Sequence, residues 1–272
     1  RLLDLDLPLL PEDLRLSELP GYGLAQLGDL MNKFIPLQNH FNRYLMIGGF
    51  PELVLSDDDA YAQRMLREDV VDKVIKRDVL SLFNIRSPLL MEKLFLYLCM
   101  NSTESFLAKP MNVGSKGSLK GKPKIFVADA AIRNAVLMID DVLSDEKELG
   151  AMVETTVYKH MVSFYQGSPA QLGYFRKAKD NQREVDVVVE LPRQKILCEV
   201  KYRNQSHIAE TDAIVELCKD EKSKVTNAFL ITKRLDDFGI TRHETMVPIL
   251  RVPAIAFLYI LGKTEAEGKN GM

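Results

Sequence analysis

One stretch, residues 184–201, constrains the fold of this chain more than any other. It reads EVDVVVE, then LPRQ, then KILCEVK, so two runs typical of β-strands flank a short break that contains Pro192. Glu199 and Lys201 lie two residues apart and therefore share one face of their strand. If the two runs pair as a hairpin, we expect Asp186, Glu199 and Lys201 to converge at one edge of a sheet.

Two carboxylates and an ammonium group at one place suit metal-dependent phosphodiester hydrolysis. Carboxylate oxygens are ligands that Mg²⁺ accepts, and a bound metal polarises the phosphate and generates hydroxide from water. We expect Asp186 and Glu199 to ligate Mg²⁺ and Lys201 to orient the attacking water. The alternative is a solvated charged strand face, in which Lys201 neutralises the carboxylates without any metal.

The spacing of these residues resembles the PD-(D/E)xK restriction-endonuclease-like superfamily. The resemblance implies a further acid on a preceding helix, and Glu154 in the run LGAMVE matches that position. Glu154 adjoins an apolar stripe, where a carboxylate costs free energy unless it has a partner such as a metal or a lysine. The resemblance therefore makes Glu154 a fourth candidate catalytic residue.

The elements expected after residue 149 agree with this superfamily. Hydrophobic periodicity predicts a helix, three strands, a helix and a strand, which is the core order of a restriction-endonuclease-like domain. The expected ranges outside the central hairpin are 149–164, 171–176, 207–219 and 227–232. We predict an α/β fold in which residues 146–272 form a mixed sheet flanked by helices. The apolar run 252–261 is too short to span a bilayer and predicts a further core strand, although residues 254–260 within it are compatible with a strand or a helix.

Residues 1–145 are expected to form a helical region. Residues 1–30 are rich in Leu and Pro and predict loops and short helical turns. A helix is expected over 34–46, where Gly48 and Gly49 followed by a proline end it. A long helix is expected from the acidic run 57–59 to about Leu82.

A second resemblance extends over nearly the whole chain. Its motifs are YLxxGGFPE at 44–52, KRDV at 76–79, FNIR at 83–86, VADxxIRNA at 127–135, LGAxVExxVY at 149–158, REVD at 183–186 and EVKY at 199–202. Together they resemble a bacterial and archaeal family of AAA-type ATPases with a C-terminal restriction-endonuclease-like domain of unknown function. The resemblance implies a P-loop ATPase module before residue 1, a helical middle and a nuclease-like end. Oligomers are an expectation by analogy with other AAA-type proteins.

Two features depart from that family. No P-loop motif occurs, because Gly121-Lys122 is followed by Pro123, so ATP is expected only in a missing upstream module. The winged-helix-like segment usual in the family is replaced by about residues 101–109. Lys116, Lys120 and Lys122 instead mark a basic loop, which is either simply flexible or a contact for a nucleic-acid backbone.

Composition narrows the class of protein. A net charge of −2 argues against a generally basic nucleic-acid binder, although a local basic patch is compatible with it. Three scattered cysteines favour a reduced cytoplasmic protein, and no apolar run is long enough for a membrane span. We expect nucleic acid or another protein as partner. The alternative to a nuclease is a non-catalytic nucleic-acid-binding or protein-docking module of an ATP-driven switch.

Overall fold

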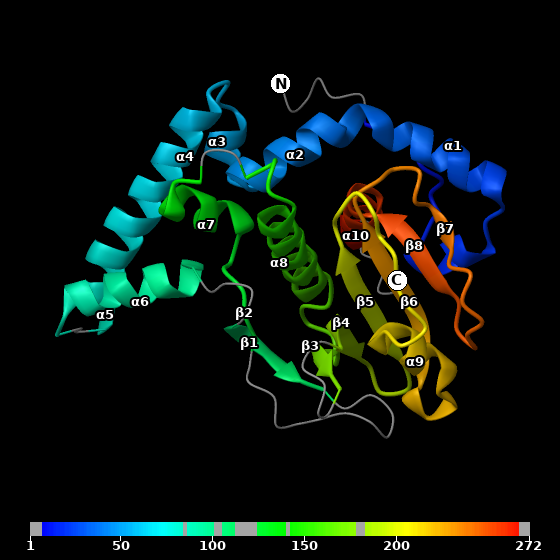
Figure 1. The fold of residues 1–272 in the computed structure, drawn as a ribbon. Helices are drawn as coiled ribbons and strands as arrows, with labels where there is room; N and C mark the ends of the chain where they lie inside the picture. The colour runs from blue at the N-terminus through cyan, green and yellow to red at the C-terminus, as the bar shows by residue number, and fades with distance from the viewer. Residues whose placement is uncertain are drawn as a thin grey trace. The chain divides into compact units, whose positions relative to one another are not determined.

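The computed structural model describes residues 7–83, 86–100, 105–111, 124–139, 142–177 and 183–266 (Figure 1). Backbone contacts divide the chain into two compact units, each assembled from segments that are distant in sequence. The first unit contains residues 1–7, 39–106 and 124–156, and the second contains 8–38, 107–123 and 157–272. The expected boundary between residues 145 and 146 lies inside the last segment of the first unit, and the domain organisation stays a prediction.

The first unit is mainly helical. Its elements are α2 (Gln38–Ile47), α3 (Pro51–Val54), α4 (Asp59–Arg67), the π-helix η4 (Glu68–Val79), α5 (Leu80–Phe83), α6 (Pro88–Met100), the short strand β2 (Lys124–Ile125), α7 (Ala130–Leu137) and the first part of α8 (Glu146–Phe164). The long helix expected after the acidic run is confirmed as the continuous helical run α4–η4–α5. Asp58 caps its start, because its carboxylate accepts a hydrogen bond from the backbone N–H of Tyr61 at 2.9 Å.

The core of this unit joins α4 to α7. Its buried residues are Ile47, Leu53, Ala62, Leu66, Ala131 and Ala135. The turn after α2 is tied to the same place, because Gly48 has φ +75 and lies against Asp129. Asp129 in turn caps α7, since its Oδ1 accepts from the N–H of Ala131 at 3.0 Å. The Gly-Gly turn and the VAD motif are thus one packed structure.

The second unit is built on a mixed sheet. Its strands are β1 (Ser105–Pro110), of which residues 107–110 belong to this unit, β3 (Gln171–Arg176), β4 (Glu184–Glu190), β5 (Lys195–Lys201), β6 (Val225–Thr232), β7 (Gly239–Ile240) and β8 (Ile249–Pro253), in the order β1-β3-β4-β5-β6-β8-β7. β3, β4 and β5 form an antiparallel meander, whereas β5, β6 and β8 are parallel. This mixed sheet confirms the predicted fold class.

Helices cover both faces of this sheet. The helical elements of the unit are η2 (Leu16–Gly21), α1 (Leu24–Phe34), η3 (Ile35–Leu37), the second part of α8, α9 (Ala213–Lys219) and α10 (Ala254–Ala266). Ile214 and Leu217 of α9 pack in one core with Leu230 of β6. Phe229, the residue before Leu230 in β6, faces Phe257 of α10, with ring centroids 5.5 Å apart. The predicted order of helix, three strands, helix and strand is confirmed as α8, β3, β4, β5, α9 and β6 (Figure 1).

Three expectations about elements were wrong in part. Residues 24–34 form the helix α1, where loops and short turns were expected up to residue 30. The run 252–261 is not a strand, because β8 ends at Pro253 and α10 follows. α10 is buried on nearly all sides, so its sequence lacks the polar face that reveals a helix. The helix expected over 207–219 begins only after its N-cap, Asp212. Within the described part of the chain, no helix has both the length and the apolar character to cross a membrane.

Candidate functional site

The site forms where the hairpin of β4 and β5 reaches the end of the sheet core. Val187 lies opposite Cys198 and Val188 opposite Leu197 in the antiparallel register, so the expected hairpin is confirmed. Because side chains alternate along β5, Glu199 shares a face with Leu197. Alternation does not extend to Asp186, because the register of β3 with β4 shifts between Val185 and Val188, the stretch that contains Asp186. Val188 and Leu197 belong to the core that α9 covers. Glu199 therefore extends this apolar layer with a carboxylate, and Asp186 adds a second buried carboxylate from the neighbouring strand.

The three residues expected at the site do meet. The Nζ of Lys201 lies 2.6 Å from Oε1 of Glu199. Asp186 reaches the same segment of β5, since its Oδ2 accepts a hydrogen bond from the N–H of Val200 at 2.8 Å. Asp186 and Glu199 are only 7% and 6% exposed, whereas the Lys201 side chain is 27% exposed. The geometry is a pair of buried carboxylates beside a lysine with access to solvent.

Lys201 is held in its charged form. Burial of the side chain lowers its pKa, but the Coulomb attraction and hydrogen bond of Glu199, together with the charges of Asp186 and Asp212, raise the pKa above its ordinary value. Lys201 is therefore an ammonium group at neutral pH. It can donate hydrogen bonds and stabilise negative charge, but it has no lone pair with which to act as a general base.

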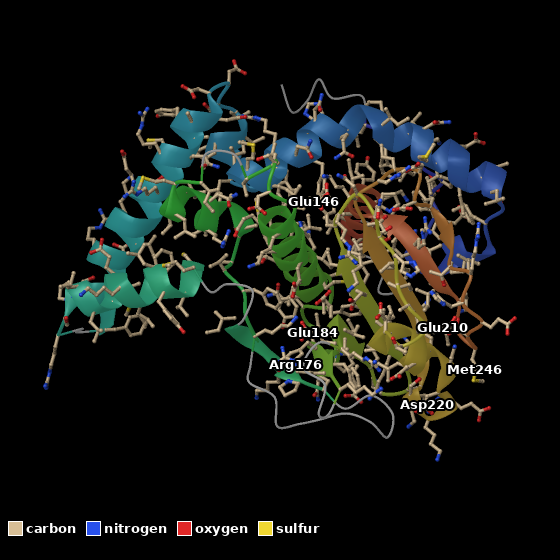
Figure 2. All side chains as sticks on the ribbon, viewed as in Figure 1. Glu146, Arg176, Glu184, Glu210, Asp220 and Met246 are labelled. Carbon is tan, nitrogen blue, oxygen red and sulfur yellow. The ribbon has the colours of Figure 1, made fainter. Side chains whose placement is uncertain are left out.

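The other acids of the hairpin are committed to ion pairs at the strand ends. Glu184 binds Arg176 of β3, with 2.7 Å between Oε2 and Nη2, and the two side chains lie together in Figure 2. Glu190 binds Lys195 across the hairpin at 2.9 Å. Asp186 and Glu199 are thus the buried acids of the hairpin that do not belong to these two pairs.

This donor set fits a magnesium ion. Mg²⁺ is commonly held by one or two carboxylates, and water and substrate phosphate complete its coordination. Asp186 and Glu199 supply two carboxylates from adjacent strands. Over the residues that the structure describes, no group of three or more His, Cys, Asp or Glu side chains is arranged to hold an ion. A cation here would thus depend on water or substrate oxygens for most of its ligands.

The chain matches two domains of unknown function. Residues 149–252 match the one described as DUF4143, and residues 38–114 match the one described as DUF8612. DUF4143 is found in AAA-ATPase-associated proteins in some families. A search of curated proteins gave no match to the chain. The DUF4143 match spans the hairpin and the expected helical acid, so it includes all four candidate catalytic residues.

Glu154, the expected helical acid, lies on α8 in the part that belongs to the first unit. Its Oε1 lies 3.0 Å from Nζ of Lys124. Lys124 is almost fully buried at 3% exposed, and the Glu154 side chain is 16% exposed. A buried carboxylate requires a partner, and in the structure Lys124 is a partner of Glu154. A catalytic role for Glu154 stays a prediction.

The three lysines expected at a nucleic-acid backbone lie just beyond the end of the DUF8612 match. Lys116, Lys120 and Lys122 all fall in residues 112–123, which lie outside the described residues. The prediction of a basic loop is therefore neither confirmed nor contradicted.

Sequence reasoning missed two residues beside Lys201. Asp212, the N-cap of α9, contributes its charge to the raised pKa of Lys201. Thr232, the last residue of β6, is the register partner of Lys201. No motif marks either residue, because the parallel pairing of β5 with β6 joins positions about thirty residues apart in the sequence. An Asp immediately before an apolar helix was the one available signal, and it predicts only a helix cap.

Proposed function

We propose that this chain hydrolyses a phosphodiester bond in nucleic acid with the help of a divalent metal. The observation that carries the proposal is the meeting of Asp186, Glu199 and Lys201 at the end of the hairpin, with both carboxylates buried. Asp186 and Glu199 would hold Mg²⁺, and Lys201 would orient the attacking water. When bound, Mg²⁺ would polarise the phosphate and promote deprotonation of water.

The protein's own groups supply the rest of the chemistry. The ammonium of Lys201 would donate hydrogen bonds to the attacking water or to a phosphate oxygen, where negative charge builds up in the transition state. The water oxygen loses a proton to solvent and bonds to phosphorus, the bond from phosphorus to the leaving oxygen breaks, and the leaving oxygen takes up a proton from solvent. The buried setting of Asp186 and Glu199 strengthens each of these electrostatic interactions.

Cations near the site support a polyanionic substrate. Arg203 is exposed just after β5, and Lys233 follows β6 directly. Neither side chain forms an ion pair with any residue in the described ranges. β5 and β6 are parallel neighbours, so both cations lie at the carboxyl edge of the sheet, where α/β folds bind ligands. They would contact backbone phosphates.

A second candidate function is a non-catalytic module that docks nucleic acid or protein. The close pair of Lys201 and Glu199 favours it, because this pair neutralises one carboxylate without any metal. The site would then be a structural ion-pair network at the end of the sheet, and Arg203 and Lys233 would bind a partner without cleaving it.

Cleavage assays on the full chain test the proposal. Labelled single- and double-stranded DNA and RNA would be incubated with Mg²⁺ or Mn²⁺ and with wild type, Asp186→Asn, Glu199→Gln or Lys201→Met. We expect each substitution to slow cleavage by at least about 100-fold. Glu190→Gln is the matched control. Glu190 lies in β4, as Asp186 does, but its carboxylate pairs with Lys195. Cleavage that survives in Asp186→Asn contradicts the proposal, and no cleavage by wild type favours the docking module.

A further inference from the structure

Thr232 carries a buried hydroxyl group that the fold itself does not use. The residue is 0% exposed, and its Oγ1 has no hydrogen-bond partner in the described portion of the chain. Buried side-chain hydroxyls in native proteins nearly always have a partner, so an exception requires an explanation. Valine has almost the same shape and no polar atom, and packing alone would favour valine at this position.

The register places Thr232 beside Lys201. The two residues are Cα partners in the parallel pair of β5 and β6, and neighbouring strands lie about 4.8 Å apart. Paired residues of adjacent strands point to the same face, and Glu199 pairs in the same way with Leu230. Leu230 belongs to the core under α9, so Thr232 lies on the face that carries Glu199 and Lys201.

Metal binding would change the partner of Lys201. In the structure its ammonium binds Oε1 of Glu199. A cation bound to Glu199 competes for the same carboxylate and repels the ammonium. The Lys201 side chain is 27% exposed, so a released ammonium that stays at the site, and does not turn towards solvent, needs another acceptor close by.

We propose that Thr232 is that acceptor and positions Lys201 when Glu199 binds a divalent cation. The inference rests on the metal site of the proposed function and adds a positioning residue to it. The hydroxyl of Thr232 would accept a hydrogen bond from Lys201, which keeps the ammonium at the site after it leaves Glu199. Thr232 would thereby make it more favourable for a metal ion to replace Lys201 as the partner of Glu199.

Calorimetric titration of Mn²⁺ into the full chain tests this role. Thr232→Val removes the hydroxyl and keeps the shape, whereas Thr232→Ser keeps the hydroxyl. We expect Thr232→Val to weaken metal binding by about 10- to 100-fold, as is usual for residues that support metal ligands. Thr232→Ser should bind with an affinity close to that of wild type. The melting temperature of metal-free Thr232→Val should be unchanged or higher, because the change removes an unpaired buried hydroxyl.

Thr241→Val is the matched control. The Oγ1 of Thr241 is also buried without a hydrogen-bond partner in the described ranges, but Thr241 follows β7 at the far edge of the sheet. Its substitution should leave metal binding unchanged. If Thr232→Val does not fold, Thr232→Ala replaces it. Wild-type affinity in a folded variant without the hydroxyl overturns the inference alone, whereas no binding by wild type overturns the proposed function and the inference together.

Discussion

The pair of Lys124 and Glu154 shows how this chain keeps charge inside a helical unit. A lysine that is 3% exposed is stable only with a close counter-charge, and Glu154 at 3.0 Å provides one. We predict that Lys124→Met lowers the free energy of unfolding by about 3 kcal/mol, because it leaves a mostly buried carboxylate without its lysine. Urea unfolding followed by circular dichroism measures this loss.

The double variant Lys124→Met with Glu154→Gln is the control for that prediction. It removes both charges, so it should recover part of the lost stability. A double variant less stable than Lys124→Met would show that Glu154 is stabilised by other groups and that the pair is not its main support.

Gly48 is required by both its backbone and its surroundings. Its φ of +75 disfavours any side chain, and an added Cβ would lie 2.8 Å from Oδ1 of Asp129. Gly48→Ala should therefore destabilise the protein by about 2 kcal/mol. Gly28→Ala is the matched control, because Gly28 lies inside α1 with nothing within 4 Å of an added Cβ. This control should gain up to about 1 kcal/mol, and thermal melting of the two variants compares them directly.

Two helices carry buried cysteines whose reactivity reports on the unfolding of each unit. Cys99 of α6 belongs to the first unit, and Cys218 of α9 belongs to the second. Burial raises the pKa of Cys99 to about 11 and that of Cys218 to about 12. Both thiols are therefore protonated at pH 8, and the thiolate is the reactive form.

We predict that the native protein resists thiol reagents at pH 8 and reacts only when a unit opens. Exposed thiols in the unfolded chain have a pKa of about 8.5 and would react readily. Mass spectrometry of labelled peptides along a urea gradient would show whether Cys99 and Cys218 become reactive together. Fast labelling of either thiol without urea would contradict the buried positions.

Element order was readable from the sequence, whereas parallel register was not. The alternating valines around Asp186 predict a strand from the local sequence alone. The break at Pro192, followed by a second strand-like run, predicts that the two strands pair as a hairpin. Lys201 beside Thr232 depends on a parallel pair joined through α9, and no local pattern records that register. The sequence does not distinguish a strand from a helix over residues 254–260 of α10 for a different reason, since a helix buried on nearly all sides has no polar stripe. The sequence predicts that Glu154 has either a metal or a lysine as its partner. In the structure that partner is Lys124.

In the molecule as a whole, we propose that the second unit carries a divalent-metal site. The hairpin, the parallel strand β6 and the helix α9 together bring two buried carboxylates and an ammonium to one end of the sheet. Two carboxylates that hold a metal should also link metal concentration to stability, because a ligand that binds only the folded state raises the melting temperature.

The most direct measurement is a titration of Mn²⁺ into the full chain, read by calorimetry, for wild type and for Asp186→Asn. The amide keeps the size of the side chain and removes the negative charge that a cation requires. The proposed site predicts one saturable binding event in wild type that Asp186→Asn loses. Equal binding by both proteins, or no binding by wild type at millimolar Mn²⁺, would contradict it.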